Sequence, residues 1–156
     1  DIIIDIINGR YNPMIKGHFP LVDVRDLAEL HVKLMESGRG ARRYFLSGKR
    51  IPFTDLIDKI SDLTGCRIRY FMVPSWLIEV PVRLIDLLTP FIPFRIPVTL
   101  EGFRFAKWDP VYDDSKTKKE LKISLRPYYE TLSDTIKWLH SIGKINDKQA
   151  GKLSND

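Results

Sequence analysis

Residues 20–31, with the sequence PLVDVRDLAELH, decide the fold of this chain. Their apolar start predicts a short buried strand, and the residues from Val24 onward predict an amphipathic helix that follows it directly. Asp23 is a suitable N-cap for this helix, and Gly38 suits its left-handed end. We expect His31 to be a hydrogen-bonded histidine of the core. The predicted apolar face consists of Val24, Leu27, Ala28, His31, Leu34 and Met35.

Two further segments have the apolar spacing of amphipathic helices. The first covers residues 53–64 and is stopped by Gly65. The second is the last long helix, which Pro127 opens and Gly143 closes. The side chains expected to face the core are Phe53, Leu56, Ile57, Ile60 and Leu63 in the first, and Leu132, Ile136 and Leu139 in the second.

Other segments predict strands, a loop and a short helix. Alternating or aromatic character predicts strands at residues 43–47, 67–73 and 111–113. Repeated prolines predict a loop at residues 91–97, and a short helix is expected over residues 99–107.

Composition narrows the classes of protein. The chain has 156 residues, one domain's worth, and its hydrophobic content of 44% is ordinary for a globular protein. Because it begins with Asp1 and an apolar run, we expect it to be a piece of a longer protein. The net charge of +5 is scattered among acidic residues, which does not favour a nucleic-acid site. The single cysteine, Cys66, excludes an internal disulfide and a cysteine zinc site, and three scattered histidines predict no metal centre.

Three motifs, in this order and spacing, resemble the second half of extended short-chain dehydrogenases/reductases of the NAD-dependent epimerase/dehydratase family. They are VDVRDLAELH at residues 22–31, GARRYFLSG at 40–48 and DSKTKKEL at 114–121. The similarity is greatest to dihydroflavonol-reductase-like and 3β-hydroxysteroid-dehydrogenase-like members, and it covers residues 1–143. It implies an α/β fold: the C-terminal portion of a doubly wound Rossmann-type domain with a smaller α+β substrate-binding lobe. Residues 144–156 contain few apolar residues and are expected to be a disordered tail.

Catalysis in this family requires a glycine-rich phosphate turn and a Tyr-x-x-x-Lys pair on a helix. The sequence contains no matching glycine-rich turn, so no cofactor-binding residue is assigned. Tyr112 and Lys116 match the pair formally, but Tyr112 is predicted on a strand and Lys116 beyond a helix cap. We therefore expect a structural role for both and assign no catalytic residue.

Four residues are candidates for substrate binding: His18, Phe19, Leu21 and Trp76. In the family, the loop that holds His18 precedes the strand bordering the substrate crevice. Sugar-nucleotide epimerases usually have an arginine there, and its replacement by His18 and Phe19 argues against a nucleotide-sugar substrate. Residues 76–96 are rich in large apolar side chains. They fit a helix packed on the core, a lid over a lipophilic substrate, or a segment that docks on a membrane surface, but prolines and charges argue against a membrane span.

The resemblance implies the substrate-binding half of an NAD(P)-dependent oxidoreductase or epimerase acting on a carbonyl or secondary alcohol, and the apolar segment favours a lipophilic one. NAD or NADP would be bound by the other half, so the chain alone is expected to be inert and to bind no cofactor. The expected partners are its own N-terminal cofactor-binding half, a small lipophilic substrate and a second copy of the chain. A cytoplasmic location is expected, with peripheral membrane contact as a further option. The alternative is a non-catalytic interaction module that dimerises or packs on a partner.

Overall fold

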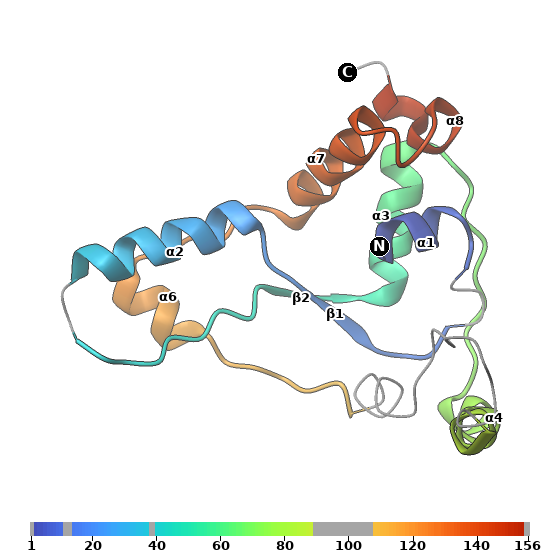
Figure 1. Ribbon diagram of the computed structural model, residues 1–156, viewed down its shortest axis with the longest axis horizontal. Coiled ribbons are helices and arrows are strands. Elements are labelled where there is room, and N and C mark those ends of the chain that lie inside the picture. The colour runs from blue at the N-terminus through green and yellow to red at the C-terminus, as the bar shows by residue number, and fades with distance from the viewer. Residues whose placement is uncertain (1, 11–13, 38–39, 89–107, 155–156) are drawn as a thin grey trace.

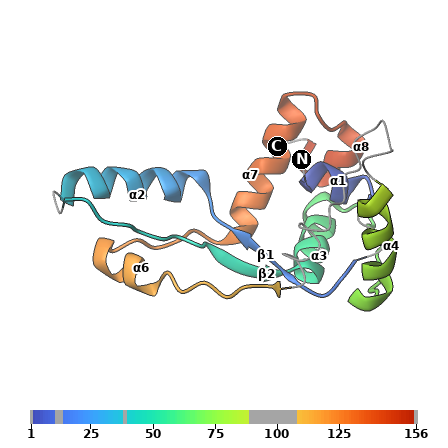
Figure 2. The same cartoon turned by 60° about the horizontal axis from the view of Figure 1, so that its bottom comes forward.

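The computed structural model describes residues 2–10, 14–37, 40–88 and 108–154. In both views, the β1–β2 ribbon separates α2 and α6 at one end from α1, α3, α7 and α8 at the other (Figures 1 and 2). The fold is therefore mixed α/β. The elements are α1 (Ile2–Ile7), β1 (His18–Leu21), α2 (Val24–Ser37), β2 (Lys49–Pro52), α3 (Phe53–Thr64), α4 (Ser75–Leu88), α6 (Ser115–Leu121), α7 (Tyr128–Ser141), α8 (Asp147–Ala150) and the 3₁₀ turn η2 (Gly151–Ser154).

The main hydrophobic core lies between α3 and α7. Leu56 and Ile60 of α3 and Ile136 of α7 are each 1% exposed or less, and Ile6 of α1 joins the same cluster. Gly65 ends α3 in the left-handed conformation, with φ of 74°. The predicted position of α3 and the core-facing sides of both helices are thus confirmed.

Residues 144–154 pack on this core, so the prediction of a disordered tail is wrong for them. Asn146 and Gln149 form a capping box that starts α8. Ile145 and Ala150 are 3% and 0% exposed and pack against the α3–α7 cluster. At Gly151 a Cβ atom would lie 1.8 Å from the carbonyl oxygen of Thr64, because the backbones approach closely there. Three apolar residues, Ile145, Ala150 and the partly buried Leu153, anchor this segment on the core.

Helix α2 confirms the predicted helix and part of its predicted apolar face, since Leu27 and Leu34 are partly buried against a second cluster. The strand expected before it is β1. Leu30 of α2 packs with Leu121 and Ile123 in a second, smaller cluster beside α6. His31 is exposed and its Nδ1 contacts the carbonyl oxygen of Leu27, so it is not a core histidine. The exposed apolar residues of α2 include Val24, Val32 and Met35, at 75%, 53% and 84%. Val24, His31 and Met35 were wrongly placed on the buried face, because the surface that α2 buries against the Leu121 cluster is centred on Leu30.

The strand predicted at residues 43–47 is replaced by β2, a few residues later. β2 pairs antiparallel with β1, with Phe19 opposite Ile51. The backbone of residues 43–47 instead donates to side chains around α6: Phe45 to Thr117 Oγ1 at 3.2 Å and Ser47 to Asp114 Oδ2 at 3.1 Å. Side-chain acceptors thus satisfy amides that would otherwise need a strand partner.

The other predicted strands are also wrong in the described chain. Residues 67–73 contribute a single bridge, from Met72 to Met14, and residues 111–113 have no strand partner. Neither segment lies beside a longer strand that could continue the pairing.

Helix α4 begins at Ser75 and contains Pro81. Trp76 and Val80 are 66% and 61% exposed, so this end of α4 is not packed on the core. No helix in the described ranges is long and apolar enough to cross a membrane. The predicted loop at residues 91–97 and helix at 99–107 lie outside the described residues.

Candidate functional site

A pocket of about 410 Å³ lies between the β1–β2 ribbon and the segment that leads into α6. β1 contributes His18 and Phe19, both of which were predicted to contact substrate. The opposite wall comes from residues 109–114, about ninety positions further along the chain. The lining is mainly apolar, with a few polar groups at one side. The residues used in the arguments below are His18, Phe19, Arg50, Phe53, Asp109 and Tyr112.

The polar side of this pocket is a cluster of three charged or titratable side chains. His18 Nδ1 lies 2.7 Å from Asp109 Oδ2, and Arg50 Nη2 donates to the same oxygen. Partial burial raises the pKa of the Asp109 carboxyl, but the hydrogen bonds from His18 and Arg50 outweigh burial and hold that pKa below its ordinary value. At neutral pH the cluster therefore contains the Asp109 carboxylate, which accepts hydrogen bonds from His18 and Arg50.

Sequence reasoning found His18 but missed Asp109 and Arg50. Asp109 adopts a left-handed φ of 46°, which aspartate tolerates better than most residues. The Asp-Pro step at residues 109–110 is a turn signal that marks the position. Nothing in the local sequence reveals that this turn lies against β1, since the contact spans 91 positions.

The other two candidate residues lie elsewhere. Leu21 lines a second groove, of about 640 Å³, together with Phe19, Val24 and Trp138. Trp76 lies on α4 and lines neither this groove nor the His18 pocket. The structure thus brings His18 and Phe19 together, places Leu21 at a neighbouring surface and leaves Trp76 apart.

Tyr112 and Lys116 do not form a helical pair. Tyr112 precedes α6, where its ring packs on Phe45 with the centroids 5.2 Å apart. Lys116 is exposed on α6, and no contact between the two side chains occurs in the described chain. The neighbouring Asp114 is buried and accepts hydrogen bonds from the backbone and hydroxyl of Ser47. The DSKTKKEL motif thus links α6 to the segment before β2.

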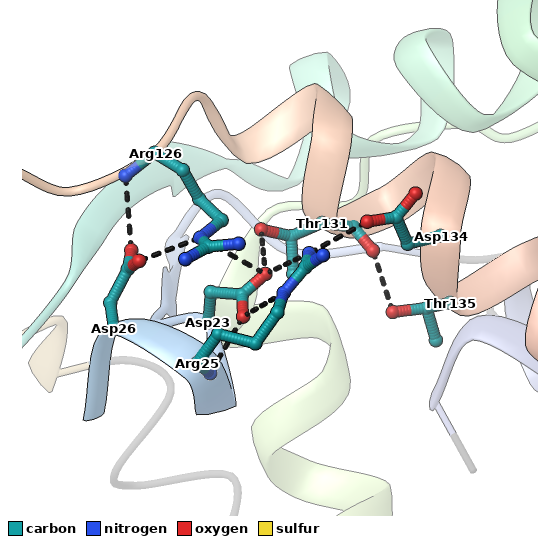
Figure 3. A network of polar contacts seen from close by, with 7 residues as sticks. All are labelled: Asp23, Arg25, Asp26, Arg126, Thr131, Asp134 and Thr135. Atoms are coloured by element: carbon teal, nitrogen blue, oxygen red, sulfur yellow. Dashed lines mark hydrogen bonds and ion pairs between the residues drawn. The ribbon is translucent and has the colours of Figure 1, made fainter. Parts of the chain in front are cut away.

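The VDVRD motif builds a buried polar network at the start of α2 (Figure 3). Asp23 is 5% exposed and accepts hydrogen bonds from the backbone and guanidinium of Arg25 and from Thr131 Oγ1 at 2.8 Å. Hydrogen bonds from Arg25 are the main reason that the pKa of Asp23 lies far below its ordinary value. Arg25 also pairs with Asp134 of α7 at 2.7 Å. Asp23 is therefore the predicted N-cap, and in addition it joins α2 to α7.

Asp26 makes the second half of this network. Its carboxylate accepts from the backbone N–H of Arg126 at 3.0 Å and from its Nε at 2.6 Å. Asp26 is 2% exposed, whereas the Arg126 side chain is 27% exposed, so the carboxylate is the buried partner of this pair. The sequence indicated a favourable carboxylate in the first turn of the helix but not its distant partner, one hundred positions away.

The two helix starts that follow β1 and β2 have amides already in use. A cofactor diphosphate is bound by free amides at a helix N-terminus. At the β1–α2 turn a buried carboxylate, Asp23, accepts the amide of Arg25. At the β2–α3 junction the amide of Phe53 donates to the carbonyl oxygen of Gly17 at 3.1 Å. Among the described residues, no group of three or more His, Cys, Asp or Glu side chains is arranged to hold a metal ion.

The fold and the pocket define this chain as part of a mixed α/β protein with a small-molecule pocket. In fold it is similar to the crystal structure of gox2253, with a TM-score of 0.71 and 23% identity, covering 93% of this chain and 44% of that one. No protein-family model matches the chain.

Two curated proteins are similar in sequence. Sterol demethylase protein B of Methylococcus capsulatus is 24% identical over 145 residues, covering 92% of this chain and 44% of that protein. The protein named "Putative dihydroflavonol 4-reductase" of Synechocystis is 25% identical over 154 residues, covering 93% and 43%. These similarities support the chain as a C-terminal part of an NAD-dependent epimerase/dehydratase-family protein, which confirms the resemblance seen in the motifs. The chain spans less than half the length of the relatives it matches.

Proposed function

We propose that residues 1–143 form the substrate-binding part of an NAD(P)-dependent reductase or epimerase that acts on a lipophilic carbonyl compound or secondary alcohol. The observation that carries this proposal is the pocket between β1, β2 and residues 109–114. It has apolar walls around Phe19 and Phe53 and one polar cluster around His18. Its volume of about 410 Å³ lies within the range of small-molecule sites, which are mostly apolar with a few placed polar groups.

The names of the relatives agree with this substrate class. One contains the word sterol and the other dihydroflavonol, and both terms denote fused-ring or multi-ring molecules with oxygen substituents. The family similarity does not favour the alternative of a non-catalytic interaction module. Reduction and epimerisation share the same requirement for a carbonyl or alcohol carbon held beside a nicotinamide.

The cofactor and the proton-transferring residues would come from an N-terminal half of the same protein. The described chain has apolar surfaces that such a half would cover. They include Val24 and Met35 on α2 and the groove beside Leu21 and Trp138. Because exposed apolar patches of this kind usually mark an interface, we infer that the two halves pack along β1 and α2.

The proposal is tested by comparing the 156-residue chain with the protein encoded together with its upstream region. The longer protein is expected to oxidise NADH or NADPH in the presence of lipophilic ketones, measured by nicotinamide absorbance. In the reverse direction, with the matching secondary alcohols and NAD or NADP, His18→Phe should raise the KM for the alcohol with a smaller effect on kcat. Asp147→Asn on α8, which does not line the pocket, should change neither. Tight dinucleotide binding or turnover by the 156 residues alone would refute the proposal that this chain binds substrate and a separate N-terminal half binds the cofactor.

A further inference from the structure

Among the described residues, His18 has a hydrogen-bond partner at one ring nitrogen and none at the other. Nδ1 lies 2.7 Å from Asp109 Oδ2. In the described chain no hydrogen bond reaches Nε2, although 26% of the side chain is exposed at the pocket. A ring nitrogen without a protein partner beside an apolar pocket is available to a bound molecule.

Asp109 determines which nitrogen carries the proton. A carboxylate can only accept, so the proton of a neutral imidazole lies on Nδ1 and the lone pair lies on Nε2. Arg50 donates to the same carboxylate oxygen and its guanidinium favours the charged form of Asp109. Asp109 therefore cannot donate to the ring while Arg50 remains in place.

We propose that His18 Nε2 accepts a hydrogen bond from a hydroxyl group of the substrate, and that Asp109 is the positioning residue that fixes His18 in this acceptor form. This inference rests on the proposed function and narrows its substrate class. The ligand is an apolar molecule that carries a hydroxyl group against β1. A ketone at the same place offers no proton and leaves Nε2 without a partner.

The apolar remainder of the pocket fits this class. Phe19 and Phe53 lie with their ring centroids 6.3 Å apart and provide aromatic surface beside the cluster. On the opposite wall, Tyr112 packs on Phe45. A ring-shaped hydrocarbon body thus has aromatic contacts on two sides, while its hydroxyl group faces His18.

The tautomer is measured directly by nitrogen–proton correlation NMR of the histidine rings in the 156-residue chain, recorded at about pH 9, where imidazoles are generally neutral. The expected result is an Nδ1–H ring for His18. Asp109→Gly removes the acceptor, and glycine suits the φ of 46°. It should shift His18 toward the Nε2–H form.

The matched control is His140, whose Nε2 lies 2.7 Å from Asp147 Oδ1 on the far side of the molecule. Asp147→Asn should alter the His140 signals and leave those of His18 unchanged. An Nε2–H ring at His18 in the unmodified chain would overturn the proposal, whether or not the variants fold.

Recognition is measured with menthol and menthone, an alcohol and a ketone with the same carbon skeleton, by titration of the 156-residue chain. Menthol should bind about tenfold more tightly than menthone, which corresponds to about 1.4 kcal/mol, the net worth of one hydrogen bond. Asp109→Gly and His18→Phe should reduce this ratio toward one. Equal binding of both probes, or a preference for menthone, would overturn the proposal. Either result leaves the proposed function standing if the longer protein still reduces lipophilic ketones with NADH or NADPH.

Discussion

The buried half of the VDVRD network allows a sharp stability prediction. Asp26→Asn keeps an oxygen for the backbone N–H of Arg126 but removes the charge that faces its guanidinium. The Asp26 side chain is 3% exposed and that of Arg126 is 27% exposed, so water can replace the lost interaction only from the arginine side. Arg126 would retain Asp23, 3.8 Å away, as its nearest charge. Exchanging a charge-assisted hydrogen bond for a neutral one at this depth should cost about 2 kcal/mol.

The assay is equilibrium urea unfolding followed by circular dichroism. With an m-value of about 2 kcal/mol/M, typical of small proteins, the midpoint should fall by about 1 M without a change of slope. Asp134→Asn is the matched control, since Asp134 also pairs with an arginine but its side chain is 53% exposed. It should cost about 0–1 kcal/mol. Equal losses for the two variants would refute the reasoning that burial determines the worth of these pairs.

Three further predictions concern the same framework. Folding lowers the pKa of Asp23, so the stability that its carboxylate contributes is complete above the ordinary carboxyl pKa and is lost as pH falls. The free energy of unfolding should therefore decline below about pH 5, and it should decline less steeply in Asp23→Asn. Gly151→Ala should strongly lower the temperature of thermal unfolding, because its Cβ would meet the carbonyl of Thr64. Gly143→Ala meets no atom within 4 Å, so only the strain of its positive φ should lower that temperature, by less. Ile136→Ala, at 0% exposure in α7, should cost about 2–5 kcal/mol in urea unfolding, while Trp138→Ala on the exposed side should cost less.

Helices α3 and α7 illustrate what local sequence determines. Each has enough apolar residues at helical spacing to define one buried side, and Gly65 or Pro127 marks an end. The N-cap role of Asp23 was predictable for the same reason, because it depends on a neighbour two positions away. The family resemblance was also readable, since it rests on the order of short motifs.

Helix α2 and the chain end show where local patterns are insufficient. The apolar residues of α2 occupy more than one side, and only packing on α6 decides that Leu30 is buried while Met35 is exposed. Ile145 and Ala150 belong to a polar segment, yet the α3–α7 core holds them. Burial depends on which surface is presented from elsewhere in the chain, and composition of the segment itself does not contain that information.

The candidate site divides in the same way. From the sequence, His18 and Phe19 were predicted to contact substrate because the resemblance places them at the substrate crevice, and they lie in β1, just before α2. Tertiary structure alone decided that Asp109 and Arg50 meet His18, and that Asp26 meets Arg126. The physical reason is separation along the chain. These pairs are 59 to 100 positions apart, so no local sequence pattern indicates them, and only the folded backbone brings their charges within hydrogen-bonding distance.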